Sequence, residues 1–151
     1  MTQFKLRPAT PADLPICTEI RGKTRDNPIS KEVLAQYGVT TESWTPLLLE
    51  QTIMGSVIEQ NQQVVAFAFA DTRSAEILVV AILPDVENQG LGKMLLNHLV
   101  EKLKMLGHNR IWLAAAPDPS MRAYGFYRHL GWISTGKYDQ QGDEILEMYV
   151  Y

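Results

Sequence analysis

Two glycines stand one residue apart where an apolar run gives way to an amphipathic helix, in the stretch ILPDVENQGLGKMLL, residues 82–96. Glycine costs a helix about 1 kcal/mol relative to alanine, so Gly90 and Gly92 need another reason to be there. A helix N-terminus presents unpaired backbone N–H groups and the positive end of the helix dipole, and glycine lets an anion approach them closely. The stretch therefore predicts a cradle for a phosphate or diphosphate, to which Lys93 adds a positive charge.

The same stretch has other possible interpretations. The simplest is a turn with two incidental glycines. A Walker phosphate loop needs a glycine at position 87 and Ser or Thr after the lysine, but Glu87 and Met94 stand there. A dinucleotide fingerprint needs a third glycine where Leu95 stands. Neither nucleotide motif fits.

Two further residues could move protons. Tyr127 lies in the stretch SMRAYGFYRHLGW, residues 120–132, and a phenol with a pKa near 10 stays protonated at neutral pH and can give a proton to a leaving group. Glu76 opens an apolar run that leads to the glycines, and burial would raise its pKa and make it a better base. The alternatives are an ordinary half-buried aromatic for Tyr127 and a solvated charge at a strand edge for Glu76.

The helices and strands that must position these residues can be predicted from hydrophobic periodicity and from the residues that begin and end such elements. A helix should begin at Pro11 after the cap Thr10, with Asp13 completing a capping box, and another should follow the cap Ser30 and end at Gly38. Residues 40–51 are ambiguous because Pro46 either starts a helix or breaks one that runs from Thr41. We predict strands at 4–8, 55–60, 63–71, 76–83, 110–116, 132–138 and 144–151, and later helices at 91–106 and 120–130. This order predicts an α/β domain with a mixed sheet and helices on its faces.

Composition narrows the class of protein. The chain has 151 residues, of which 46% are hydrophobic, and this predicts a single domain over residues 1–151. The net charge of -3 gives no general attraction to nucleic acid or to an acidic membrane, and no apolar run is long enough to span one. The lone Cys17 fits a reducing compartment, so we expect a cytoplasmic protein. The three histidines show no metal-ligand spacing, so we expect no metal.

Taken together, the two motifs resemble those of the GNAT superfamily of acyl-CoA-dependent N-acetyltransferases. The first is similar to [QR]-x-x-G-x-[GA] at the start of the long helix, with Glu87 where the family has Gln or Arg. The second is similar to N-x-x-A-x-x-[LF]-Y-x-x-x-G-[FW], with Ser120 in place of Asn. A carboxylate at position 87 would repel phosphates unless it points to solvent. The resemblance covers nearly the whole chain.

The resemblance implies a GNAT fold, with about seven mostly antiparallel strands, and transfer of an acetyl group from acetyl-CoA to a primary amine by direct attack in a ternary complex. The resemblance also implies that Tyr127 is the general acid and that Glu76 is a candidate base, although many members use ordered water instead of a base. It further implies that backbone N–H groups near residues 80–82 polarise the thioester carbonyl. A non-catalytic acyl-CoA-binding sensor is the alternative. The residues implied in cofactor binding are Ile82, Leu83, Glu87, Asn88, Gln89, Gly90, Leu91, Gly92, Lys93, Ser120, Ala123 and Phe126.

Two weaker expectations concern partners. The basic run at residues 21–27 lies where acceptors dock in the family, and either Arg25 or Asp26 could touch the acceptor there, or the run could be a solvated loop. The apolar C-terminal stretch EMYVY could pair with a second chain, so a homodimer is an expected assembly.

Overall fold

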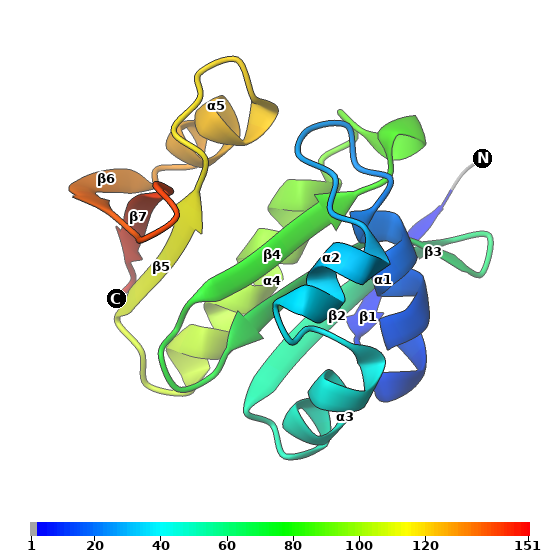
Figure 1. Ribbon diagram of the computed structural model, residues 1–151. Coiled ribbons are helices and arrows are strands. Elements are labelled where there is room, and N and C mark those ends of the chain that lie inside the picture. The colour runs from blue at the N-terminus through cyan, green and yellow to red at the C-terminus, as the bar shows by residue number, and fades with distance from the viewer. Residues whose placement is uncertain (1–2) are drawn as a thin grey trace.

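The computed structural model describes residues 3–151 of the chain and contains seven strands (Figure 1). The first half runs β1 (Phe4–Pro8), the short 3-10 turn η1 (Pro11–Asp13), α1 (Leu14–Arg21), α2 (Lys31–Gln36), α3 (Thr41–Leu49), β2 (Ile53–Gln60) and β3 (Gln63–Asp71). The second half runs β4 (Ile77–Ile82), η2 (Pro84–Val86), α4 (Leu91–Met105), β5 (Arg110–Ala115), α5 (Arg122–His129), β6 (Ile133–Tyr138) and β7 (Glu144–Tyr149).

The strands form two antiparallel sheets that meet at a single point. One has the order β1-β2-β3-β4 and the other the order β5-β7-β6. In the described residues the two are joined only by a parallel bridge between Glu76 and Trp112, just before β4 begins. Beyond that bridge β4 and β5 separate, so each has one edge without a strand partner (Figure 1). The predicted α/β class is confirmed, with seven strands divided between two sheets.

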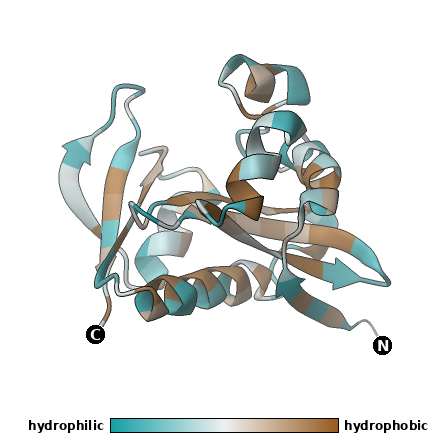
Figure 2. Cartoon of the chain, turned by 90° about the horizontal axis from the view of Figure 1, so that it is seen from below, coloured by the Kyte–Doolittle hydropathy of each residue, from teal (hydrophilic) through white to brown (hydrophobic). Residues whose placement is uncertain are grey.

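Helices cover both faces of the larger sheet, as alternation along β3 requires. Ala66, Ala68 and Ala70 are buried against α4, whose own stripe is Leu91, Leu95, Leu96, Leu99 and Leu103. Phe67 and Phe69 point the other way and pack with α1 and with Trp44 of α3. The sheet thus runs between α4 on one side and α1 to α3 on the other, with apolar residues facing inward (Figure 2). Because successive strand side chains alternate, one strand serves two cores.

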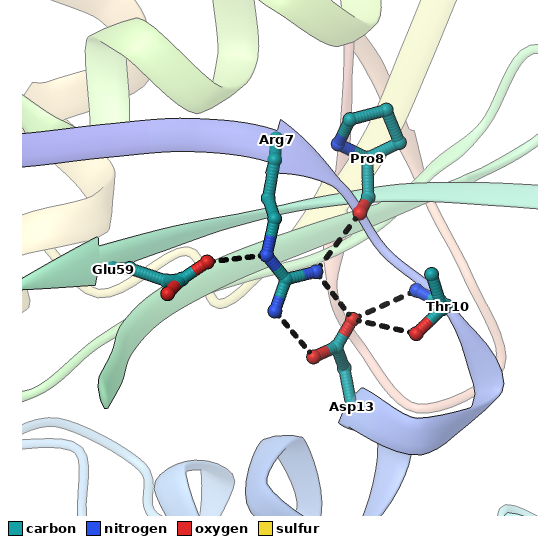
Figure 3. A network of polar contacts seen from close by, with 5 residues as sticks. All are labelled: Arg7, Pro8, Thr10, Asp13 and Glu59. Atoms are coloured by element: carbon teal, nitrogen blue, oxygen red, sulfur yellow. Dashed lines mark hydrogen bonds and ion pairs between the residues drawn. The ribbon is translucent and has the colours of Figure 1, made fainter. Parts of the chain in front are cut away.

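An ion-pair network fixes the start of α1 (Figure 3). The Asp13 carboxylate accepts from the backbone N–H of Thr10 at 2.8 Å, as the predicted capping box requires, and from both terminal nitrogens of Arg7 at 2.8 and 2.9 Å. Arg7 also pairs with Glu59 on β2. Asp13 is buried, so the network ties β1, β2 and α1 together at the edge of the sheet.

Two helices differ from the sequence prediction. Residues 41–49 form α3 straight through Pro46. Thr40 and Ser43 cap its start reciprocally, and the Thr45 hydroxyl donates to the Thr41 carbonyl at 2.6 Å. The last helix begins at Arg122 and not at Ser120, since Met121 is extended and Ser120 hydrogen-bonds back to Asp118. Ser120 therefore lies in the preceding loop.

Candidate active site

A cavity of about 1110 Å³ opens where β4 and β5 separate. Its walls come mainly from segments that are far apart in the sequence: the end of α1 with the loop after it, residues between α2 and α3, the cleft side of β4 and β5, the loop leading into α4, and α5. Of the predicted site residues, those on its wall are Ile82, Glu87, Asn88, Gly90, Leu91, Gly92, Lys93, Ala123, Phe126 and Tyr127. The fold thus brings most of the two motifs to one hollow.

The loop into α4 presents a run of backbone donors to this cavity. In the described part of the chain the N–H groups of residues 88–93 donate to no protein acceptor, and no side chain caps the helix. Asn88 and Gly90 have left-handed backbone conformations, with φ of 62° and 79°, which bend the chain so that several N–H groups converge. Gly90 is thus the residue before α4 and not part of its first turn. Such a curved set of amides at a helix N-terminus binds anions.

The structure gives Gly92 a different role from the one predicted. A Cβ added there would lie 2.9 Å from Cζ of Phe126 and 3.2 Å from Cδ1 of Ile82, whereas one added at Gly90 would meet nothing. The missing side chain therefore makes room for α5 to pack on α4. It does not open space for a phosphate, and only the N–H of Gly92 is left to serve an anion.

The Glu87 carboxylate does not point to solvent. Its side chain is 8% exposed, its Oε1 accepts from Nε of Arg25 at 3.0 Å, and its Oε2 pairs with Arg122. Two guanidinium groups therefore offset its charge beside the amide cradle, which removes the repulsion expected of an unpaired carboxylate.

Arg122 ties the mouth of the cavity together. Its Nη2 donates to Oδ1 of Asn88 at 2.7 Å, and its backbone N–H donates to Oδ2 of Asp26 at 2.9 Å. Three segments consequently meet here: the loop after α1, the loop before α4 and the start of α5. Arg25 and Asp26, either of which was a candidate to touch an acceptor, are engaged in these contacts.

Tyr127 is buried among aromatic rings but reaches the cavity wall. Its ring lies edge-on to Phe126 and Trp132, with centroids 5.1 and 6.0 Å apart. No described residue forms a hydrogen bond with its hydroxyl, and the hydroxyl oxygen is not fully buried. Burial raises the pKa of Tyr127 to about 12, against the opposing effect of the nearby Arg21 cation. The phenol is held protonated and facing the hollow.

The free edge of β4 supplies further donors. The N–H of Leu83 donates to Val65 on β3, so alternation along the strand turns the N–H groups of Val80 and Ile82 away from β3 and toward the separated β5. These are the amides that the resemblance assigned to the carbonyl of a thioester, and they face the cavity.

The structure does not bring Glu76 to the cavity wall. It lies at the closed end of the cleft, where its backbone bridges Trp112, and it is not among the residues that line the hollow. Burial first, and then the charges of Asp71 and Asp139, raise the pKa of the Glu76 carboxyl. That direction suits a base, but proton transfer from the cavity would have to pass through water.

Three other predicted binding residues also lie off the wall. Leu83 packs into the cores and Gln89 is exposed beside the amide cradle. The Ser120 hydroxyl donates to Asp118 at 2.7 Å and is exposed. Their backbones flank the cavity without their side chains entering it.

Sequence reasoning missed Arg21, the last residue of α1, which lines the cavity near Tyr127. Its position at a helix C-terminus is ordinary for a basic residue, so no local signal distinguishes it. Cys17, on the turn before, is 3% exposed, and burial raises the pKa of its thiol to about 12. It is a packed thiol and not a nucleophile.

Two features are absent from the described residues, 3–151. No group of three His, Cys, Asp or Glu side chains is placed to hold a metal ion there. Within the same range no helix is both long enough and apolar enough to cross a bilayer.

Comparison with known proteins identifies the class. Residues 22–132 match the acetyltransferase (GNAT) family, and the chain belongs to that family. It is 38% identical over 81 residues to an uncharacterized N-acetyltransferase, ycf52, of Gracilaria tenuistipitata var. liui, covering 50% of this chain and 42% of that protein. It is 33% identical over 76 residues to the [ribosomal protein bS18]-alanine N-acetyltransferase of Escherichia coli K12, covering 49% and 51%. The chain thus matches about half the length of these curated relatives or less.

Solved structures show the same fold. The PaiA N-acetyltransferase from Thermoplasma acidophilum, in complex with coenzyme A, superimposes with a TM-score of 0.82 at 18% identity, covering 98% of this chain and 99% of that one. The ribosomal-protein-S18-alanine N-acetyltransferase from Escherichia coli gives a TM-score of 0.71 at 22% identity, covering 98% and 94%. The predicted GNAT fold is confirmed.

Proposed function

We propose that the protein transfers an acetyl group from acetyl-CoA to a primary amine by direct attack in a ternary complex. The observation that carries the proposal is that five residues whose backbone N–H groups have no protein acceptor in the described chain, Asn88 and residues 90–93, line one cavity together with Tyr127. The amides fit the diphosphate of the cosubstrate, and the phenol fits its sulfur end.

The reaction needs two proton movements, and the cavity offers a place for each. The amine nitrogen attacks the thioester carbonyl carbon, while the N–H groups of Val80 and Ile82 stabilise the charge that develops on its oxygen. As the carbon–sulfur bond breaks, Tyr127 gives its proton to the departing thiolate, and the products are the acetylated amine and free coenzyme A. The Arg21 cation stabilises the phenolate that results.

Glu76 is proposed as the base that takes the proton from the attacking amine, through water. Its raised pKa supports that role, and its place behind the bridge to Trp112 requires the water. Replacing Glu76 by Gln tests it: the expected result is loss of the acidic limb of the rate's pH profile. An unchanged profile removes Glu76 from the mechanism.

The deciding experiment is a screen of amines with acetyl-CoA and detection of the released thiol. It should include free amino acids, polyamines, aminoglycosides and peptides that begin with alanine, the last because relatives are named for alanine N-acetylation. Amine-dependent thiol release is expected. Calorimetric binding of acetyl-CoA without release on any amine would favour the alternative, a non-catalytic acyl-CoA sensor.

A further inference from the structure

Arg21 is a cation on the cavity wall whose hydrogen-bonding capacity is only partly used. Its Nη1 donates to the carbonyl of Asn27 at 2.7 Å and lies 3.4 Å from the Thr24 hydroxyl, which fixes the guanidinium in place. In the described part of the chain its Nε and Nη2 donate to no protein atom. A held guanidinium with one open edge presents two N–H groups in the geometry that matches a carboxylate.

No acid among residues 3–151 balances this charge. Arg21 forms no ion pair with any carboxylate among residues 3–151. The acids near the mouth are already used, since Glu87 takes both Arg25 and Arg122, and Asp26 accepts the backbone N–H of Arg122. Burial also lowers the pKa of Arg21, which shows that the charge loses hydration there. A partly desolvated cation of this kind is costly unless a ligand supplies the anion.

The position of Arg21 in the cavity indicates which ligand would supply this anion. Arg21 lies close enough to Tyr127 for its charge to act on the phenol, and the proposed function places the reacting thioester at that phenol. An anion bound by Arg21 would therefore share the cavity with the attacking amine, and one small molecule can carry both groups. The same cavity wall includes the apolar side chains of Leu34, Val39 and Trp44.

We propose that Arg21 binds the carboxylate of the acceptor, and that the acceptor is an amine carrying a carboxylate, with α-amino acids of apolar side chain as its class. The inference rests on the proposed function and deepens it. Arg25, in the same loop, is the contrasting case, because Glu87 already neutralises it.

Matched acceptor pairs test this directly. Apolar α-amino acids are compared with their primary amides, which keep the amine and the side chain and replace the negative carboxylate with a neutral amide. We expect wild-type kcat/KM to favour the acids by about 10- to 100-fold, the range for a hydrogen-bonded charge. Arg21→Gln should abolish that preference through the KM of the acid and leave the KM of acetyl-CoA within about twofold. Arg21→Lys should keep part of the preference.

Arg110→Gln is the control, because Arg110 pairs with Glu147 on β7 and lies off the cavity wall. The wild-type comparison stands even if an Arg21 variant fails to fold. Equal rates for acids and amides, or a preference that survives in a folded Arg21→Gln, overturn the inference and leave acetyl transfer standing. A fall in kcat that is equal for both members of a pair, with the preference for acids kept, also overturns it, since Arg21 would then act only on Tyr127. If none of the amines tested supports turnover, the proposed function itself is wrong.

Discussion

Gly92 and Phe126 are in direct contact where α4 meets α5: a Cβ on Gly92 would lie 2.9 Å from Cζ of the ring. The two motifs of the site are therefore locked together by packing, one through its missing side chain and the other through an aromatic ring. Tyr127 follows Phe126 on α5, so this contact also sets how far the phenol stands from the amide cradle.

Gly92→Ala should disturb stability and binding together. The added methyl group must displace Phe126 or Ile82, and overpacking of this kind costs about 1–3 kcal/mol. We expect a lower urea midpoint and roughly tenfold weaker acetyl-CoA binding by calorimetry. Gly125→Ala on α5 is the matched control for stability, since its Cβ meets nothing within 4 Å, and it should leave the urea midpoint unchanged or raise it. Normal stability in Gly92→Ala would contradict the packing explanation.

Glu87→Gln should strengthen acetyl-CoA binding while weakening the fold. The change removes a negative charge beside the cradle and releases Arg25 and Arg122 to face the diphosphate. We expect severalfold tighter binding with a steeper dependence on salt, and a loss of about 1 kcal/mol in unfolding free energy, because both arginines are well exposed. Calorimetry at two salt concentrations measures the first effect. Glu101→Gln, on the exposed side of α4, is the control, and weaker binding in Glu87→Gln would refute the release of the arginines.

Local pattern explains why so much of the fold could be predicted. The alternation through β3 and the leucine stripe of α4 are properties of short stretches, and each reports directly which face is buried. The division of the sheet is not local. The sequence pattern of a strand is the same whether the neighbouring strand stays paired with it or separates from it. The residues from Glu76 to Ile82 therefore do not predict the cleft beside β4.

The site divides in the same way. The cradle and Tyr127 were found because each lies within a short motif of fixed spacing. The partner of Glu87 was not, because Arg25 lies 62 residues away and its pairing depends on how the loop after α1 folds over the cavity. Arg21 was missed for the same reason, since its open N–H groups are defined by which acids are occupied elsewhere.

Tyr127→Phe should separate chemistry from binding. Loss of the hydroxyl removes the proposed proton donor but keeps the ring that packs on Phe126 and Trp132. We expect kcat to fall about 10²- to 10⁴-fold with acetyl-CoA affinity within about twofold. Because the Tyr127 pKa is raised to about 12, the wild-type rate should show no loss of an acid between pH 6 and about 10. Tyr124→Phe on the same helix is the control, and full activity in Tyr127→Phe would end the role of the phenol.

Asp13 should make the stability of the fold depend on acidic pH. Hydrogen bonds from Arg7 hold the pKa of the buried Asp13 carboxyl below its ordinary value. A carboxyl with a lowered folded-state pKa contributes stability that is complete above its unfolded value, near 3.9, and is lost as the pH falls through the folded value. Asp13→Asn should therefore reduce the unfolding free energy by about 1–3 kcal/mol at pH 7, with a smaller deficit near pH 3.

Urea titrations at the two pH values measure the Asp13 effect, with the exposed Asp85→Asn as control. Asp13→Asn keeps the shape of the side chain and one acceptor oxygen, so a deficit that shrinks in acid reports the ion pair with Arg7 and not a lost cap. A deficit of the same size at pH 3 and pH 7 would instead assign the stabilisation to the neutral hydrogen bond with Thr10. In that case the charge of Arg7 would be free of any role in holding β1 to α1.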